Sequence, residues 1–193
     1  MTAFGKITLA AKPVLLGLLL AMSGPATAAG DDDANLDKVR KQSEQVLARL
    51  YAAQPSARAA IASSKGYATF SRWGLTLGPV GGGIGKGLLV ALPSRKETFM
   101  RFVEGSAGLG FGIKKYDVIF VFQDANALNE FASKGWEAGG KATAAAKGRA
   151  GGKAFEGAVS VSPGVWVYQN TDKGLAAELS ISGTKYYKDP SLN

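Results

Sequence analysis

The spacing of apolar and polar positions changes along the chain, from helical spacing to strand spacing. Between residues 31 and 53, apolar residues recur at helical intervals and predict an amphipathic helix. Pro55 interrupts this pattern, and SARAAIASS at residues 56–64 predicts a short second helix with Ser56 as a candidate N-cap. The apolar face of the first helix consists of Leu36, Val39, Val46, Leu47, Leu50 and Tyr51.

Strand patterns begin at residue 65. We predict separate strands over residues 65–73, 77–89, 98–104 and 105–115, with a turn at residues 91–97 (ALPSRKE). The segment YDVIFVFQD at residues 116–124 is rich in β-branched and aromatic residues, which predicts a strand buried on both faces.

Glycine alternates with other residues in two of these predicted strands. Because side chains on a strand repeat every second residue, each run has one face of bare backbone. Such a face either lets a neighbouring segment pack closely or lines a groove for an acyl chain or head group. The first run fits neither the Walker A pattern nor the dinucleotide-binding glycine pattern. The glycines are Gly81, Gly83, Gly85 and Gly87 in the first run and Gly108, Gly110 and Gly112 in the second.

A helix and a hairpin are predicted in the second half of the chain. Asp124 is placed as an N-cap, Leu128 and Phe131 form an apolar face, and Gly135 ends the helix. Alternation returns after residue 154, and QNTDKG at residues 169–174 predicts a hairpin turn. Together these elements predict an α+β fold: a small curved, mostly antiparallel β-barrel or sandwich. The N-terminal helices and one inserted helix are expected to pack on it.

The first 28 residues have the pattern of a secretory signal peptide. Lys6 and Lys12 give a positive start, and the apolar run PVLLGLLLAM is shorter than the roughly 20 residues that span a bilayer. The sequence ATA at residues 26–28 matches a cleavage site. We therefore expect a periplasmic or secreted protein, cleaved near Ala28.

Composition argues against an enzyme. The chain has no histidine and no cysteine, so Ser-His-Asp and Cys-His sites and the usual zinc sites are absent. Asp117 opens the buried strand and is expected to be hydrogen-bonded there rather than catalytic. We expect no catalytic residue, no metal site and no cofactor.

Charge points toward an anionic surface as the partner. The net charge is +8, and basic residues near an anionic membrane contribute about 1 kcal/mol each. Tryptophan favours the head-group region of a bilayer. Nucleic acid is the other partner of a basic chain, but a signal peptide and the lack of interleaved aromatics argue against it. The candidate lipid-contact residues are Lys141, Lys147, Arg149, Lys153, Lys114, Lys115, Arg72, Trp73 and Lys86.

Several segments, in order, resemble the SYLF domain family of bacterial secreted proteins and eukaryotic endocytic adaptors. They are IASSKGYATF, GPVGGGIGKGLL, GSAGLGFGIKKYDVIFVFQDANALNEF, GWEAGGKATAAAKGRAGG and GVWVYQNTDKGLAAELSISGTKYY, spanning roughly residues 45–188. With these patterns and the resemblance together, we divide the chain into a signal peptide (1–28), a helical segment packed on the domain (29–64), a SYLF-like β-rich domain (65–189) and a tail (190–193).

The family implies lipid binding, notably to phosphoinositides, and actin-filament binding in fungal members. An exported chain does not meet cytosolic actin in its own cell, so anionic phospholipid or a membrane surface is the expected partner. We therefore predict an exported, non-enzymatic protein that recognises anionic phospholipid head groups. Two alternatives stay open: a soluble periplasmic barrel that carries a hydrophobic molecule or lipid, and an envelope structural protein that acts through a protein partner.

Overall fold

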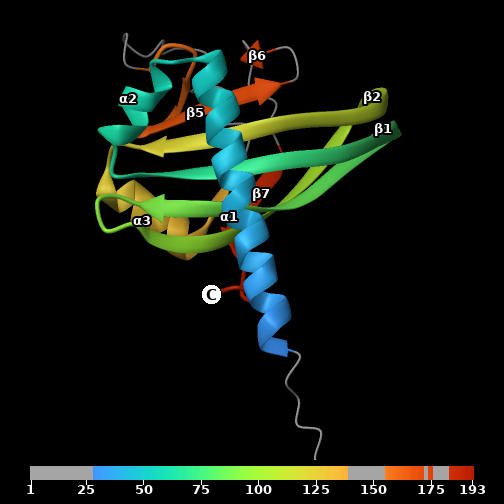
Figure 1. Cartoon of the computed structure of the whole chain (residues 1–193). Coiled ribbons are helices and arrows are strands. Elements are labelled where there is room, and N and C mark those ends of the chain that lie inside the picture. The colour runs from blue at the N-terminus through green and yellow to red at the C-terminus, as the bar shows by residue number, and fades with distance from the viewer. Residues whose placement is uncertain (1–27, 139–154, 172–173, 176–182) are drawn as a thin grey trace, which may run out of the picture.

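A computed structural model describes residues 28–138, 155–171, 174–175 and 183–193, with the side chains of 28–31, 73–80 and 106–114 left aside (Figure 1). Three helices are present in this part of the chain: α1 (Ala28–Ala53), α2 (Ala57–Ala62) and α3 (Ala125–Lys134). Within it, no helix combines the length and apolarity needed to cross a bilayer.

Two long strands dominate the sheet. Strand β1 (Gly66–Ala91) pairs antiparallel with β2 (Lys96–Phe122), with one register shift between Gly78 and Val80. The prediction of several separate strands over residues 65–124 was therefore wrong. A backbone of alternating glycines remains extended and can curl tightly, so the chain bends without interrupting the strand. The predicted turn joins the two strands after Ala91.

The long hairpin folds back on itself to give a curled sheet. One half of β2 pairs with β5 over Tyr116–Phe122, and the other half pairs with β7 over Met100–Glu104. Figure 1 shows the two halves of the hairpin as two layers joined at one side. The observed architecture is α+β with an antiparallel, curved sheet, as predicted. The remaining strands are β3 (Trp136–Glu137), β4 (Val159–Ser162), β5 (Val165–Thr171), β6 (Gly174–Leu175) and β7 (Thr184–Lys188).

Aromatic side chains fill the space between the layers. Phe70 of β1 meets Tyr186 of β7 at a ring-centroid distance of 4.6 Å, and it meets Phe102 and Phe120 of β2 at 6.0 Å. Phe131 of α3 packs against the same group of rings. Rings in these tilted and edge-on arrangements add specific contacts to the burial of apolar area.

The first glycine run is a packing surface where its surroundings are described. A Cβ on Gly87 would overlap the ring of Phe70, and one on Gly85 would lie 2.5 Å from Cε1 of Phe102. These glycines let the two halves of β1 lie side by side, with the Leu92 amide donating to the Lys65 carbonyl at 2.7 Å. The surroundings of the second glycine run lie outside the described side chains.

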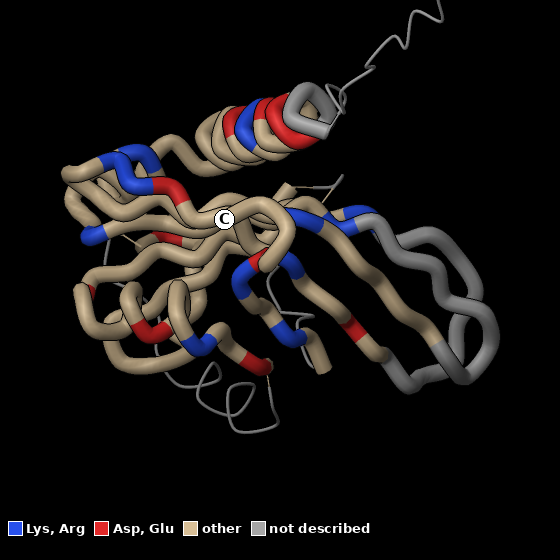
Figure 2. Tube along the Cα trace, turned by 90° about the horizontal axis from the view of Figure 1, so that it is seen from below, with Lys and Arg blue, Asp and Glu red and all other residues tan. Residues whose placement is uncertain are grey.

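Helix α1 lies across the outside of both layers (Figure 1). Its N-terminal part packs Val39 on Leu88 and Phe99, and its C-terminal part packs Val46 and Leu50 on the other layer. All six residues of the predicted apolar face are buried or partly buried. In the view of Figure 2, α1 lies along one side of the strands, and it carries both acidic and basic residues.

Local predictions for the smaller elements hold with one exception. Asp124 caps α3 by accepting the Ala127 amide at 2.9 Å, and Gly135 ends that helix with φ of 76°. The predicted hairpin joins β5 to β6. Ser56 precedes α2, but its hydroxyl makes no capping bond and accepts from Gln54 at 2.7 Å instead.

Candidate functional site

Two places on the described surface have the properties of a binding site. The first is on the outer face of the layer formed by the second half of β1, the first half of β2, and β7. Adjacent strands place Ile84, Val103 and Lys185 in one row. The next row contains Lys86, Arg101 and Tyr187. We call these six residues the open patch.

The open patch exposes apolar side chains beside cationic ones. Ile84 is 71% exposed and Val103 is 44% exposed, and these are the large apolar residues that the described part of the chain leaves open to solvent. They are direct cross-strand partners, so they form one continuous apolar surface. Isolated exposed apolar residues need no explanation, but a contiguous pair within a basic rim is typical of an interaction surface.

Two carboxylates lie near this rim. Arg101 Nε is 3.8 Å from Oδ2 of the fully buried Asp189, and Glu137 is the cross-strand neighbour of Lys185. The Arg101 contact is long, and its side chain remains 43% exposed. Lys86 makes no ion pair with any described residue, and the Gln42 side chain donates to its backbone carbonyl. The positive character of the patch therefore depends mainly on Lys86 and Lys185.

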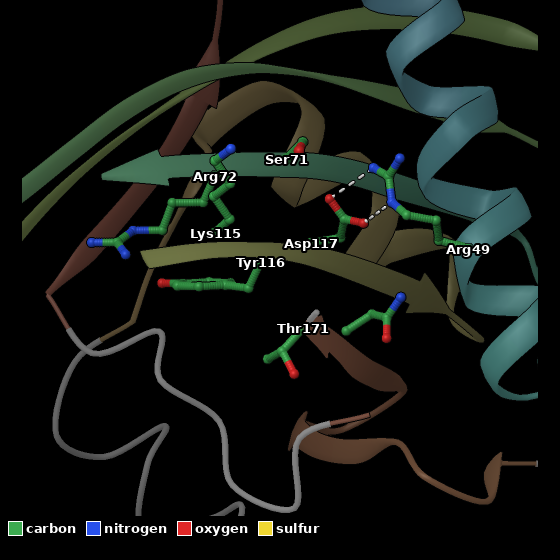
Figure 3. Close-up of a pocket in the computed structure, with 8 residues that line it drawn as sticks. Arg49, Ser71, Arg72, Lys115, Tyr116, Asp117 and Thr171 are labelled. Carbon is green, nitrogen blue, oxygen red and sulfur yellow. Dashed lines mark hydrogen bonds and ion pairs between the residues drawn. The ribbon is translucent and has the colours of Figure 1, made fainter. Parts of the chain in front are cut away.

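The second place is a cleft of about 610 Å³ at the other half of the hairpin, which we call the polar cleft. Strand pairing aligns Ser71, Asp117 and Asn170 in a row across β1, β2 and β5. Arg49 reaches this row from α1, donating to Asp117 from Nε at 2.7 Å and from Nη2 at 3.1 Å. Figure 3 shows this forked pair on the helix side of the cleft.

The neighbouring row of the cleft contains a buried ion pair. Arg72 is 4% exposed and pairs with Glu104 through both Nε and Nη2, the latter at 2.6 Å. The Tyr116 hydroxyl donates to the same carboxylate at 3.0 Å. Burial, and then the charge of Glu104, raises the pKa of Tyr116 well above its usual range. Tyr116 therefore stays protonated and keeps donating to Glu104 across the physiological range.

The structure brings some predicted contact residues together and separates others. Arg72 and Lys115 both line the polar cleft, whereas Lys86 lies on the open patch. Lys115 is exposed, but the guanidinium of Arg72 is buried and does not reach the outer surface. The backbones of Trp73 and Lys114 belong to β1 and β2 beside Lys115, and their side chains are outside the description. The predicted basic cluster lies outside the described residues: Lys141, Lys147, Arg149 and Lys153.

Sequence reasoning missed most of the open patch. Lys86 was named as a single basic residue. Ile84 and Lys86 have the strand parity opposite to the first glycine run, and this parity is the signal that could have placed both on the outer face. No local signal placed Val103, Arg101 or Lys185 beside them, because those contacts depend on strand register. Arg49 was also missed, although Asp117 was expected to be hydrogen-bonded, and it is.

Comparison with known proteins gives a family match over the second half of the chain. Residues 103–193 match the family model described as "Las17-binding protein actin regulator", the model of the SYLF domain. Over 154 residues the chain is 30% identical to Beta cell expansion factor A of Aeromonas veronii, covering 80% of this chain. The chain spans 57% of the length of that relative. These matches confirm the resemblance to the SYLF family seen in the sequence.

Proposed function

We propose that this protein is an exported, non-enzymatic protein that binds the surface of membranes containing anionic phospholipid. The observation that carries the proposal is the open patch, in which Ile84 and Val103 are exposed side by side with Lys86 and Lys185 around them. A bilayer surface complements both features, because it offers phosphates to the lysines and an apolar interior to the two aliphatic side chains.

The side chains of the open patch are expected to contribute measurably to the free energy of membrane binding. Full burial of an aliphatic side chain such as Ile84 is worth about 1.5–3 kcal/mol. Each lysine near an anionic surface adds about 1 kcal/mol, and its long stem can lie along the apolar surface while the ammonium reaches a phosphate. Tyr187 is half-buried at the edge of the patch, and tyrosine favours the head-group region. Micromolar binding corresponds to about −8 kcal/mol, so the patch supplies a large share of a measurable affinity.

The packed interior favours a surface site over an enclosed carrier site. The described space between the two layers is occupied by the rings of Phe70, Phe102, Phe120 and Tyr186. An acyl chain would have to displace these rings, at the cost of the core. The lack of histidine and cysteine supports binding rather than catalysis as the activity.

Vesicle co-sedimentation tests the proposal. We expect the protein to sediment with vesicles of phosphatidylcholine mixed with phosphatidylglycerol, and to bind pure phosphatidylcholine much more weakly. Raising the salt concentration should weaken the binding, because exposed charges are screened. Ile84→Ser combined with Val103→Ser should lower the affinity about tenfold or more, since apolar burial is lost.

A charge-matched pair of variants separates the patch from net charge. Lys86→Gln with Lys185→Gln removes two charges from the patch, and Lys38→Gln with Lys41→Gln removes two exposed charges from α1. The proposal predicts a clear loss for the first variant and little change for the second. Equal losses would show attraction by net charge alone, and unchanged binding in both patch variants would contradict the proposal.

A further inference from the structure

A smaller cavity lies between α3, the start of β3 and the β4–β5 turn, and we call it the seam pocket. Its volume is about 270 Å³. Strands β3 and β4 are the two ends of the strand order β3-β7-β2-β5-β4, and the pocket is lined by residues of both. It therefore lies where the two ends of the curled sheet approach each other, away from the open patch and the polar cleft.

One wall of the seam pocket is a face of α3. Ala127, Glu130, Phe131 and Lys134 line the pocket at helical spacing, so they lie on one side of the helix. Phe131 is buried at the base of this wall, and Ala127 is partly exposed above it. At the rim, Lys134 donates to Glu130 at 2.8 Å. This wall is therefore apolar, and the two charges at its rim neutralise each other.

The opposite wall brings an open aromatic ring together with an unmatched carboxylate. Trp136 is partly exposed, and its ring is held edge-on against Phe120 at a centroid distance of 5.3 Å. Glu137 is exposed and makes no ion pair with any residue that the structure describes, including its cross-strand neighbour Lys185. The pocket therefore has a surplus of one negative charge, in a protein whose net charge is +8.

These two groups favour a cation with an apolar body. The face of an indole ring attracts an ammonium group more strongly than the other aromatic rings do. A carboxylate accepts charge-assisted hydrogen bonds from the same ammonium. The apolar α3 wall would stay unused with a metal ion or another fully polar cation, because ligand pockets of this kind bind through apolar contact with a few polar groups that fix orientation.

We propose that the seam pocket binds a small primary amine with an apolar body, of the arylalkylamine type. The apolar body packs against Ala127 and the α3 wall, and the ammonium lies between the indole ring of Trp136 and the carboxylate of Glu137. Such an amine is protonated at neutral pH, as a lysine side chain is. A cavity of about 270 Å³ lies just below the range of drug-sized ligands, which suits a molecule of this size.

Nuclear magnetic resonance of the nitrogen-15-labelled protein, titrated with phenethylamine, tests the site. The chain has three tryptophans, and Trp136→Phe identifies the indole signal of Trp136 by its loss. We expect phenethylamine to shift this signal saturably. Glu137→Gln should weaken the affinity about fivefold to tenfold, as for the loss of one hydrogen bond to a charged group. Glu44→Gln is the matched control, because Glu44 is also exposed but lies on α1, outside the pocket, and the affinity should not change.

A neutral probe of the same shape tests the role of charge. In 2-phenylethanol a hydroxyl replaces the ammonium, so it should bind about tenfold more weakly and should not respond to Glu137→Gln. Absence of a saturable shift at Trp136 would overturn the site. Equal affinity for the two probes, or an amine affinity that Glu137→Gln leaves unchanged, would overturn the assignment of an amine. No membrane is present in these titrations, so failure of the membrane proposal would leave their result standing.

Discussion

Two apolar pairs on the outer face of the same hairpin have opposite surroundings. Leu88 and Phe99 are 4% and 6% exposed beneath Val39 of α1. Ile84 and Val103 lie four residues further along the same strands and are 71% and 44% exposed. The strand pattern is the same in both places, so the difference comes from α1, which covers one part of the face and leaves the other open.

Strand alternation and helix position therefore act separately in this fold. Alternation decides which side chains point outward, but the position of the helix decides which of them become core. The first pair stabilises the fold through burial. The second pair contributes little to the fold and is available to a partner. Substitutions can test this separation of roles directly.

The largest expected effect comes from truncating the covered pair. Phe99→Ala should lower the free energy of unfolding by about 3–5 kcal/mol, because it removes a buried ring and leaves a cavity. Val103→Ala should change it by no more than about 1 kcal/mol, the range of strand propensities. Urea unfolding followed by circular dichroism measures both. Similar losses for the two variants would contradict the assigned roles.

The two ion pairs of the polar cleft differ in the exposure of their arginine side chains: Arg72 is buried and Arg49 is partly exposed. Glu104→Ala should cost about 3–5 kcal/mol, because it leaves the charge of Arg72 buried and unpaired. Arg49→Ala should cost less, since the Arg49 side chain is 47% exposed and water can replace its guanidinium beside the buried Asp117. The same unfolding measurement ranks the two variants, and a larger loss for Arg49→Ala would reverse the assignment.

Glycines on the inner and outer faces should respond differently to an added methyl group. Gly87→Ala drives a Cβ into the ring of Phe70 and should cost about 1–3 kcal/mol. Gly105→Ala is the control, because a Cβ there meets nothing within 4 Å. Its stability should stay the same or rise slightly. Thermal unfolding of both variants checks this, and a harmless Gly87→Ala would argue against close packing at this face.

The smallest expected effect concerns alkaline pH. Tyr168 is fully buried in the cluster under α1, and burial raises its pKa to about 12, against about 10 in an unfolded chain. The folded state therefore holds this proton more tightly, so stability is constant below pH 10 and falls as the pH rises toward 12. Tyr168→Phe removes this loss and should retain about 1 kcal/mol more stability than the wild type near pH 11. Parallel curves of melting temperature against pH for the two proteins would contradict it.

Local sequence signals predicted the local elements well. The apolar face of α1, the capping of α3 by Asp124, the strand buried on both faces and the β5–β6 hairpin all depend on neighbouring residues. The merging of several strands into two depends on pairing between residues far apart in sequence, so it could not be read from local spacing. The glycine alternation left close packing and a ligand groove as alternatives, and the structure shows close packing, with Phe102 against Gly85 and Phe70 against Gly87.

The candidate sites were less predictable than the fold. Lys115 and Lys86 could be named from the sequence as single basic residues, but their neighbours come from other strands. Arg72 was named as a candidate lipid-contact residue, but its side chain is buried, on the same face of β1 as Phe70. Its partner Glu104 is 32 residues away, and only the folded hairpin brings them together. To predict the open patch, one must know the strand register and which part of the sheet face α1 covers.

Site-specific labelling tests whether the open patch is the part of the protein that enters the membrane. Because the chain has no cysteine, Ile84→Cys can carry a single fluorophore that brightens and shifts to the blue in an apolar environment. Asn129→Cys provides the control on the exposed side of α3. On adding phosphatidylglycerol vesicles, we predict a strong response at residue 84 and little at residue 129. Vesicle binding without a response at residue 84, or with an equal response at both residues, would show that the open patch is not the membrane contact.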